Sequence, residues 1–141
     1  MRAPYLVEFS KIGSPELGYI SVGEQSSLPF PIQRVYWTYC TPESVVRGNH
    51  AHHELEQLIF ATSGRIEFVL EGLDGKVETF VLDSPHLGLF VPRRYWCTIR
   101  FSREAVLMCL ASMEYREDDY IRDYDAFRAL RVSTPDLRPL H

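Results

Sequence analysis

The chain has 141 residues, of which 45% are hydrophobic and 24% are charged, a balance typical of a one-domain globular protein. Its formal net charge of −4 argues against general binding to nucleic acid or to an anionic membrane surface. No apolar run is long enough to span a membrane, and the three cysteines are widely spaced, without a CxxC pair. The first residues lack the apolar core of a signal peptide, so we predict a single domain over residues 1–141 in the reducing cytoplasm.

The first half of the chain predicts mostly short strands. Residues 1–30 hold only brief apolar runs, broken by segments rich in Gly, Pro and Ser. Residues 33–40 are rich in aromatic and β-branched side chains and predict a strand, which residues 41–49 interrupt. Residues 55–83 then predict three strands, separated by turns at Ser63-Gly64 and Asp74-Gly75.

The second half continues this pattern until its end. Residues 84–102 predict two short strands, and residues 103–115 predict one more. Only residues 116–132 predict a helix, because their large apolar side chains recur at steps of four and three and share one face, which we expect only to pack: Tyr120, Tyr124, Phe127 and Leu130. With residues 131–141 as a loose tail, the chain predicts an all-β jelly roll or β-barrel closed by a short C-terminal helix.

Three of the five histidines lie within four residues, shortly after Arg47. His50 and His52 are two residues apart and share one face of an extended chain, on which Leu58 and Phe60 also fall. That face runs from polar to apolar, as expected for a strand that leaves the rim of a site and enters the core. The pair therefore has three interpretations, as exposed surface groups, metal ligands or acid–base groups.

A metal site would combine His50, His52 and Glu56, which lies four residues after His52. A third imidazole from a later strand would complete it, but the matching segment, VPRRYWC, offers Cys97 among arginines, so we expect no metal. Acid–base chemistry needs no metal, because imidazole both takes and returns a proton near neutral pH. Two imidazoles on one wall suit proton transfer between neighbouring atoms of a substrate.

Three stretches of the chain resemble one enzyme family: VVRGNHAHHELEQLIFATSG, LGLFVPRRYW and VLMCLASMEYREDDYIRDYDAF. They are similar to the sugar 3,4-ketoisomerases that act on dTDP-linked 4-keto-6-deoxyglucose, over about residues 33–130. The resemblance implies a cupin-type jelly roll that moves the ketone from C4 to C3 without metal or organic cofactor, in the biosynthesis of 3-amino-3,6-dideoxy sugars. It also implies a homodimer that exchanges N-terminal strands within residues 1–30. From the net charge we expect no nucleic-acid or membrane partner.

Carried over residue by residue, the resemblance places the family's histidines on His50 and His52. We expect His52 to be the base, His50 a proton shuttle, and Tyr36 either an orienting group or a core residue. The expected substrate contacts are Arg47, Gln57, Trp96, Tyr39 and Arg94. An epimerase on a similar nucleotide sugar and a non-catalytic cupin that binds a metal or a sugar remain as alternatives, and the stereochemistry of the product at C4 stays open.

Overall fold

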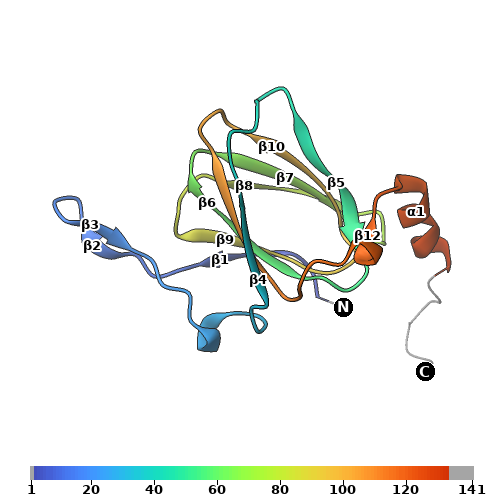
Figure 1. Ribbon diagram of the computed structural model, residues 1–141, viewed down its shortest axis with the longest axis horizontal. Coiled ribbons are helices and arrows are strands. Elements are labelled where there is room, and N and C mark those ends of the chain that lie inside the picture. The colour runs from blue at the N-terminus through green and yellow to red at the C-terminus, as the bar shows by residue number, and fades with distance from the viewer. Residues whose placement is uncertain (1, 134–141) are drawn as a thin grey trace.

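The computed structural model describes residues 2–133, so most of the predicted tail, residues 131–141, lies outside the described residues. Two five-stranded antiparallel sheets face one another (Figure 1). The first sheet has the order β1 (Tyr5–Glu8), β9 (Leu87–Val91), β6 (Gln57–Ser63), β11 (Val106–Ala111) and β4 (Arg34–Thr38). The second sheet has the order β12 (Tyr120–Ile121), β5 (Val46–His52), β10 (Trp96–Phe101), β7 (Ile66–Glu71) and β8 (Val77–Leu82).

The all-β, cupin-type jelly roll with a short C-terminal helix is confirmed. Among the described residues no strand pairing joins the two sheets, so they form an open sandwich and not a closed barrel. Alternation along the strands fills the space between the sheets, because every second side chain of a strand points to the same face. In β7, for example, Ile66, Phe68 and Leu70 are fully buried, while the residues between them are half-buried.

The histidine segment differs from its prediction. Residues 41–49 were predicted to interrupt the strands, but β5 begins at Val46 and ends at His52, and β6 begins only at Gln57. Between the two strands the chain crosses from the second sheet to the first. The face shared by His50 and His52 therefore does not continue into β6, and Gln57 approaches from the opposite sheet.

The predicted C-terminal helix begins later than expected. Residues 117–119 form a short 3-10 turn (Glu117–Asp119), β12 follows, and α1 spans Tyr124–Ser133. Tyr120 pairs with His52 in the register of β12 and β5, so it belongs to the sheet and not to the helix face. Phe127 of α1 is fully buried against Ala51 and Ile121, which holds the helix to the end of the second sheet.

Within residues 1–30, one strand joins the first sheet and a hairpin projects from the sandwich. Strand β1 pairs with β9 along its whole length, from Tyr5 opposite Phe90 to Glu8 opposite Leu87. The hairpin of β2 (Ile12–Ser14) and β3 (Gly18–Ile20) then projects from the sandwich, and a 3-10 turn (Gln25–Ser27) precedes the return to β4 (Figure 1).

Candidate active site

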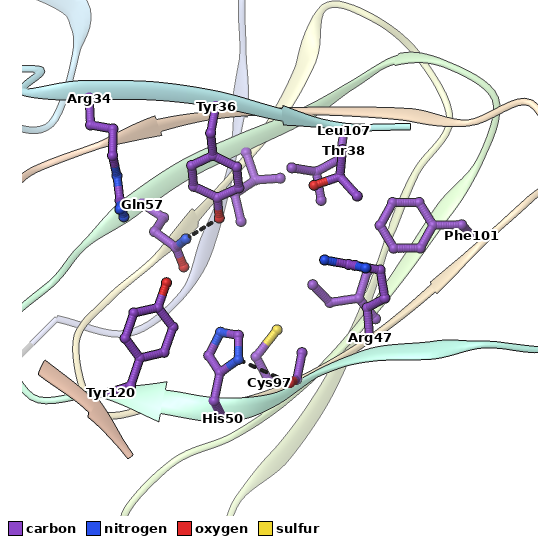
Figure 2. Close-up of a pocket in the computed structure, with 13 residues that line it drawn as sticks. Arg34, Tyr36, Thr38, Arg47, His50, Gln57, Cys97, Phe101, Leu107 and Tyr120 are labelled. Atoms are coloured by element: carbon purple, nitrogen blue, oxygen red, sulfur yellow. Dashed lines mark hydrogen bonds between the residues drawn. The ribbon is translucent and has the colours of Figure 1, made fainter. Parts of the chain in front are cut away.

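A cavity of about 200 Å³ opens between the two sheets. One wall comes from β4, β6 and β11 of the first sheet, and the other from β5, β10 and β12 of the second. The side chains around it include basic, aromatic, amide, thiol and aliphatic groups (Figure 2): Arg34, Tyr36, Thr38, Arg47, His50, Gln57, Ile59, Cys97, Ile99, Phe101, Leu107 and Tyr120. Convergent polar groups in a concave apolar setting are typical of a small-molecule site.

Strand β5 is bent just before the first histidine of the site. Gly48 and Asn49 both have positive φ angles, 84° and 56°, and the pairing of β5 with β10 shifts register between Cys97 and Thr98. A Cβ atom at position 48 would lie 2.7 Å from the carbonyl oxygen of Cys97, so only glycine fits there without movement of the backbone. The bulge places the carbonyl of Gly48 beside the His50 ring.

The ring of His50 faces the cavity in a defined tautomer. Its Nδ1 lies 2.9 Å from the Gly48 carbonyl oxygen, which can only accept, so Nδ1–H donates and Nε2 carries the free lone pair. Burial lowers the pKa of His50 from 6.5, and the charges of Arg122 and Arg47 lower it further, against the Gly48 hydrogen bond. At neutral pH the ring is therefore uncharged and available as a base.

His52 lies behind the cavity and does not line it. Its side chain is 7% exposed, and neither ring nitrogen has a hydrogen-bond partner among the described residues. Tyr120, which lines the cavity, packs 4.4 Å from the His52 ring between centroids, and the His50 ring lies 4.9 Å away. Burial lowers the pKa of His52 to about 3, with a further contribution from His50, so the ring is neutral.

Tyr36 and Gln57 meet across the first-sheet wall. Nε2 of Gln57 donates to the Tyr36 hydroxyl oxygen at 2.6 Å and also lies 3.5 Å from Sγ of Cys109. Burial raises the pKa of Tyr36 well above its ordinary value, and the neighbouring Cys109 raises it further. The phenol therefore keeps its proton at neutral pH, and its hydroxyl both accepts from Gln57 and is hydrogen-bonded to the Cys109 side chain.

Two arginines lie at opposite ends of the cavity. Figure 2 shows Arg47, from β5, beside Phe101, whereas Arg34, from β4, lies near Gln57 at the other end. Arg34 was not identified from the sequence, although it is two residues before Tyr36 on the same strand face. Tyr120 was missed because its spacing fits the helical pattern of the residues that follow.

The structure does not bring every predicted contact to this cavity. Tyr39 is 62% exposed and borders a separate surface groove with Trp37, on the outer face of β4. Arg94 lies in the turn before β10 with a φ of 62°, and its backbone N–H donates to the His52 carbonyl. Trp96 packs against α1, with ring centroids 5.2 Å from Tyr124 and 5.7 Å from Phe127.

A metal site would need a cluster of ligands. Among residues 2–133, no three His, Cys, Asp or Glu side chains are placed to hold an ion. Glu56, considered as a ligand, pairs with Arg2 at 2.5 Å and with Arg93 at 3.5 Å. Burial raises the pKa of the Cys97 thiol to about 12, so the thiolate that would bind a metal is disfavoured. The donor set around His50 therefore does not fit a metal centre.

The relatives found by comparison with known proteins are named as sugar 3,4-ketoisomerases or 3,4-oxoisomerases. The chain is 38% identical over 125 residues, 87% of its length and 88% of the relative's, to a TDP-4-oxo-6-deoxy-α-D-glucose-3,4-oxoisomerase of Aneurinibacillus thermoaerophilus. A 3,4-ketoisomerase structure from Helicobacter canadensis has a TM-score of 0.86 at 35% identity, covering 92% of this chain and 98% of that one. A mutant ketoisomerase from Thermoanaerobacterium thermosaccharolyticum, in complex with TDP-4-keto-6-deoxyglucose, has a TM-score of 0.87 at 28% identity, covering 96% and 97%.

The family model described as "WxcM-like, C-terminal" (FdtA) matches residues 3–132, and thus nearly the whole chain. This match and the 38% identical relative show that the chain belongs to the WxcM-like, C-terminal (FdtA) family.

Proposed function

We propose that this protein is a 3,4-ketoisomerase that moves the ketone of a TDP-linked 4-keto-6-deoxyglucose from C4 to C3. The observation that carries the proposal is the pairing of a neutral His50, its Nε2 free, with the protonated hydroxyl of Tyr36 around one cavity. A base and an acid are the two groups that such an isomerisation requires. The relatives' names supply the substrate class.

The reaction is a balanced exchange of protons. Nε2 of His50 takes the proton from C3, the electrons of that bond form an enediolate, and negative charge develops on the C4 oxygen. The Tyr36 hydroxyl donates to the C4 oxygen and takes the proton of the C3 hydroxyl. His50 then returns its proton to C4, which leaves the ketone at C3 and both side chains in their starting states.

This assignment differs from the expectation drawn from the sequence, which made His52 the base. His50 lines the cavity, whereas His52 packs against Tyr120 with both of its ring nitrogens buried. A general base must approach the proton that it removes. We therefore assign the base to His50 and a supporting position to His52.

We assign the pyrophosphate to Arg47. A cavity of about 200 Å³ is smaller than the 300–1,000 Å³ typical for drug-sized ligands, so it suits the sugar and leaves the nucleotide outside. Arg47 lines the end away from Gln57, and its planar guanidinium is able to grip two phosphate oxygens at once. No part of this scheme uses a metal or an organic cofactor.

We further propose that the enzyme is a homodimer. Leu17, Ile20 and Ile12 on the projecting hairpin are 89%, 65% and 57% exposed, and a second copy would cover these apolar side chains. Sedimentation should give the mass of a dimer at all working concentrations, and a stable, active monomer would overturn this assignment.

We also propose that the enzyme works in the cytoplasm, because its three cysteines are free. We propose in addition that its product enters the biosynthesis of 3-amino-3,6-dideoxy sugars. A 3-keto product is the substrate that an aminotransferase requires, and conversion of the product by such an enzyme with an amine donor would test the pathway.

The deciding experiment is incubation with TDP-4-keto-6-deoxyglucose in heavy water, followed by NMR of the sugar carbons. A ketoisomerase moves the carbonyl signal from C4 to C3. An epimerase leaves the carbonyl at C4 and inverts a neighbouring centre. A non-catalytic sugar-binding cupin changes neither, and either of these results would overturn the proposed function.

A further inference from the structure

Arg34 brings a positive charge to the end of the cavity where Gln57 lies (Figure 2). It projects from β4 and is half-buried, and its Nε is fully buried without a hydrogen-bond partner in residues 2–133. Nor does any carboxylate in that range lie within 4 Å of its guanidinium nitrogens. A buried donor that lacks an acceptor is costly, so a protein keeps one where an acceptor arrives with a ligand.

Two aromatic rings lie near this guanidinium. Its central carbon lies 5.4 Å from the ring centre of Tyr36 and 5.8 Å from that of Tyr115. Its charge also lowers the pKa of both His52 and Cys109. Ring faces hold a cation in place without neutralising it. The positive charge therefore stays available to an anion in the cavity.

The proposed reaction creates such an anion. When His50 removes the C3 proton, negative charge gathers on the C4 oxygen, and Tyr36 lies on the same strand face as Arg34. A preorganised donor aimed at developing charge lowers the barrier more than one that binds the ground state. The pyrophosphate, in contrast, is assigned to Arg47 at the opposite end.

We propose that Arg34 is a catalytic residue whose half-buried guanidinium binds the sugar's keto oxygen and stabilises the enediolate that His50 generates. The inference rests on the proposed function, because it takes the reacting anion from that chemistry. Arg34 forms no covalent bond in this step, and it neither gains nor loses a proton. Removal of one such donor typically costs about 10²–10³ in kcat.

The test compares Arg34→Gln with Arg47→Gln, and uses Arg65→Gln on the exposed surface as the control. We expect Arg34→Gln to lower kcat by about 10²–10³ while titration calorimetry with dTDP alone shows an affinity within about twofold of wild type. Arg34→Lys keeps the charge without the planar fork and should retain more activity than Arg34→Gln. If Arg34→Gln instead weakens dTDP binding and leaves kcat unchanged, Arg34 is a phosphate contact and the proposal is wrong.

A stability measurement separates catalysis from a structural role. Because Nε lacks an acceptor in the resting protein, Arg34→Met should keep or raise the melting temperature, whereas loss of a structural arginine would lower it. A lowered melting temperature together with normal kcat would overturn the proposal.

Exchange of the C3 proton with heavy water separates this inference from the proposed function. If wild type exchanges that proton but does not move the ketone, the proposed function fails, and a slower exchange in Arg34→Gln still supports Arg34. If wild type exchanges no proton, both fail.

Discussion

The carboxylate of Asp119 faces the ring of His52 in the interior, with Oδ2 3.5 Å from Nδ1 and both side chains less than 10% exposed. The same carboxylate accepts from the backbone N–H groups of Glu54 at 2.9 Å and Leu55 at 3.1 Å. Asp119 thus fixes the turn by which the chain passes from β5 to β6, and its carboxylate lies beside His52.

Replacement of Asp119 by Ala should lower the free energy of unfolding by about 2–4 kcal/mol, because one buried and one partly buried backbone N–H group lose a charged acceptor. Urea denaturation followed by circular dichroism measures the change. The neighbouring Asp118 is 75% exposed, so Asp118→Ala is the matched control and should change stability by no more than about 0.5 kcal/mol. Equal losses in the two variants would show that Asp119 does not anchor the turn.

The two histidines should differ sharply in their effect on turnover. We expect His50→Asn to lower kcat at least about 100-fold, because it removes the base, and His52→Asn to lower kcat by less than about tenfold. Both variants should bind dTDP with nearly wild-type affinity by calorimetry. The reverse order of losses would restore His52 as the base.

The pH profile of wild type should reflect the lowered pKa of His50. A base acts in its neutral form, and burial favours that form, so kcat/KM should fall only below pH 6.5. The raised pKa of Tyr36 keeps the acid protonated throughout the neutral range, so the rate should be level between about pH 7 and 8. An acid limb centred above pH 6.5 would contradict the assignment of His50.

Replacement of Tyr36 by Phe tests the proposed proton donor and changes the volume of the cavity only slightly. Tyr36→Phe removes only the hydroxyl and should lower kcat about 10²–10⁴-fold. Gln57→Leu removes the amide that donates to that hydroxyl and should lower kcat less. Tyr39→Phe, on an exposed side chain, is the control. Full activity of Tyr36→Phe would return Tyr36 to the role of a core residue.

Local patterns in the sequence predicted most of the sandwich and part of the site. Alternation, short apolar runs and turn residues located strands β6 to β11, because such runs between turns are typical of strands, whether one face is buried, as in β7, or both, as in β9. The same alternation applied to β4 places Arg34 on the face of Tyr36. That inference was available from spacing alone, although nothing in the spacing shows that this face lines a cavity.

The features that the sequence did not predict depend on contacts between distant segments. The strand that carries His50 and His52 ends at His52 because Asp119, more than 60 residues later, holds the turn that follows it. Tyr120 fits a helical spacing, but its pairing with β5 is stronger than that local preference. Periodicity reports only which residues of one element share a face, so it does not reveal that Tyr120 stands in front of His52.

Trp96 gives the last test, because the resemblance made it a substrate contact and the structure places it against α1. Its ring packs against Tyr124 and Phe127, so Trp96→Ala should lower the free energy of unfolding by about 2–4 kcal/mol and reduce the helical signal in circular dichroism. The KM for the sugar nucleotide should change less than about threefold, since the side chain does not line the cavity. Val77→Ala, at a position 57% exposed on β8, is the control for apolar truncation. A large rise in KM with unchanged stability would return Trp96 to the substrate, and the binding region would then extend from the cavity to the N-terminal turn of α1.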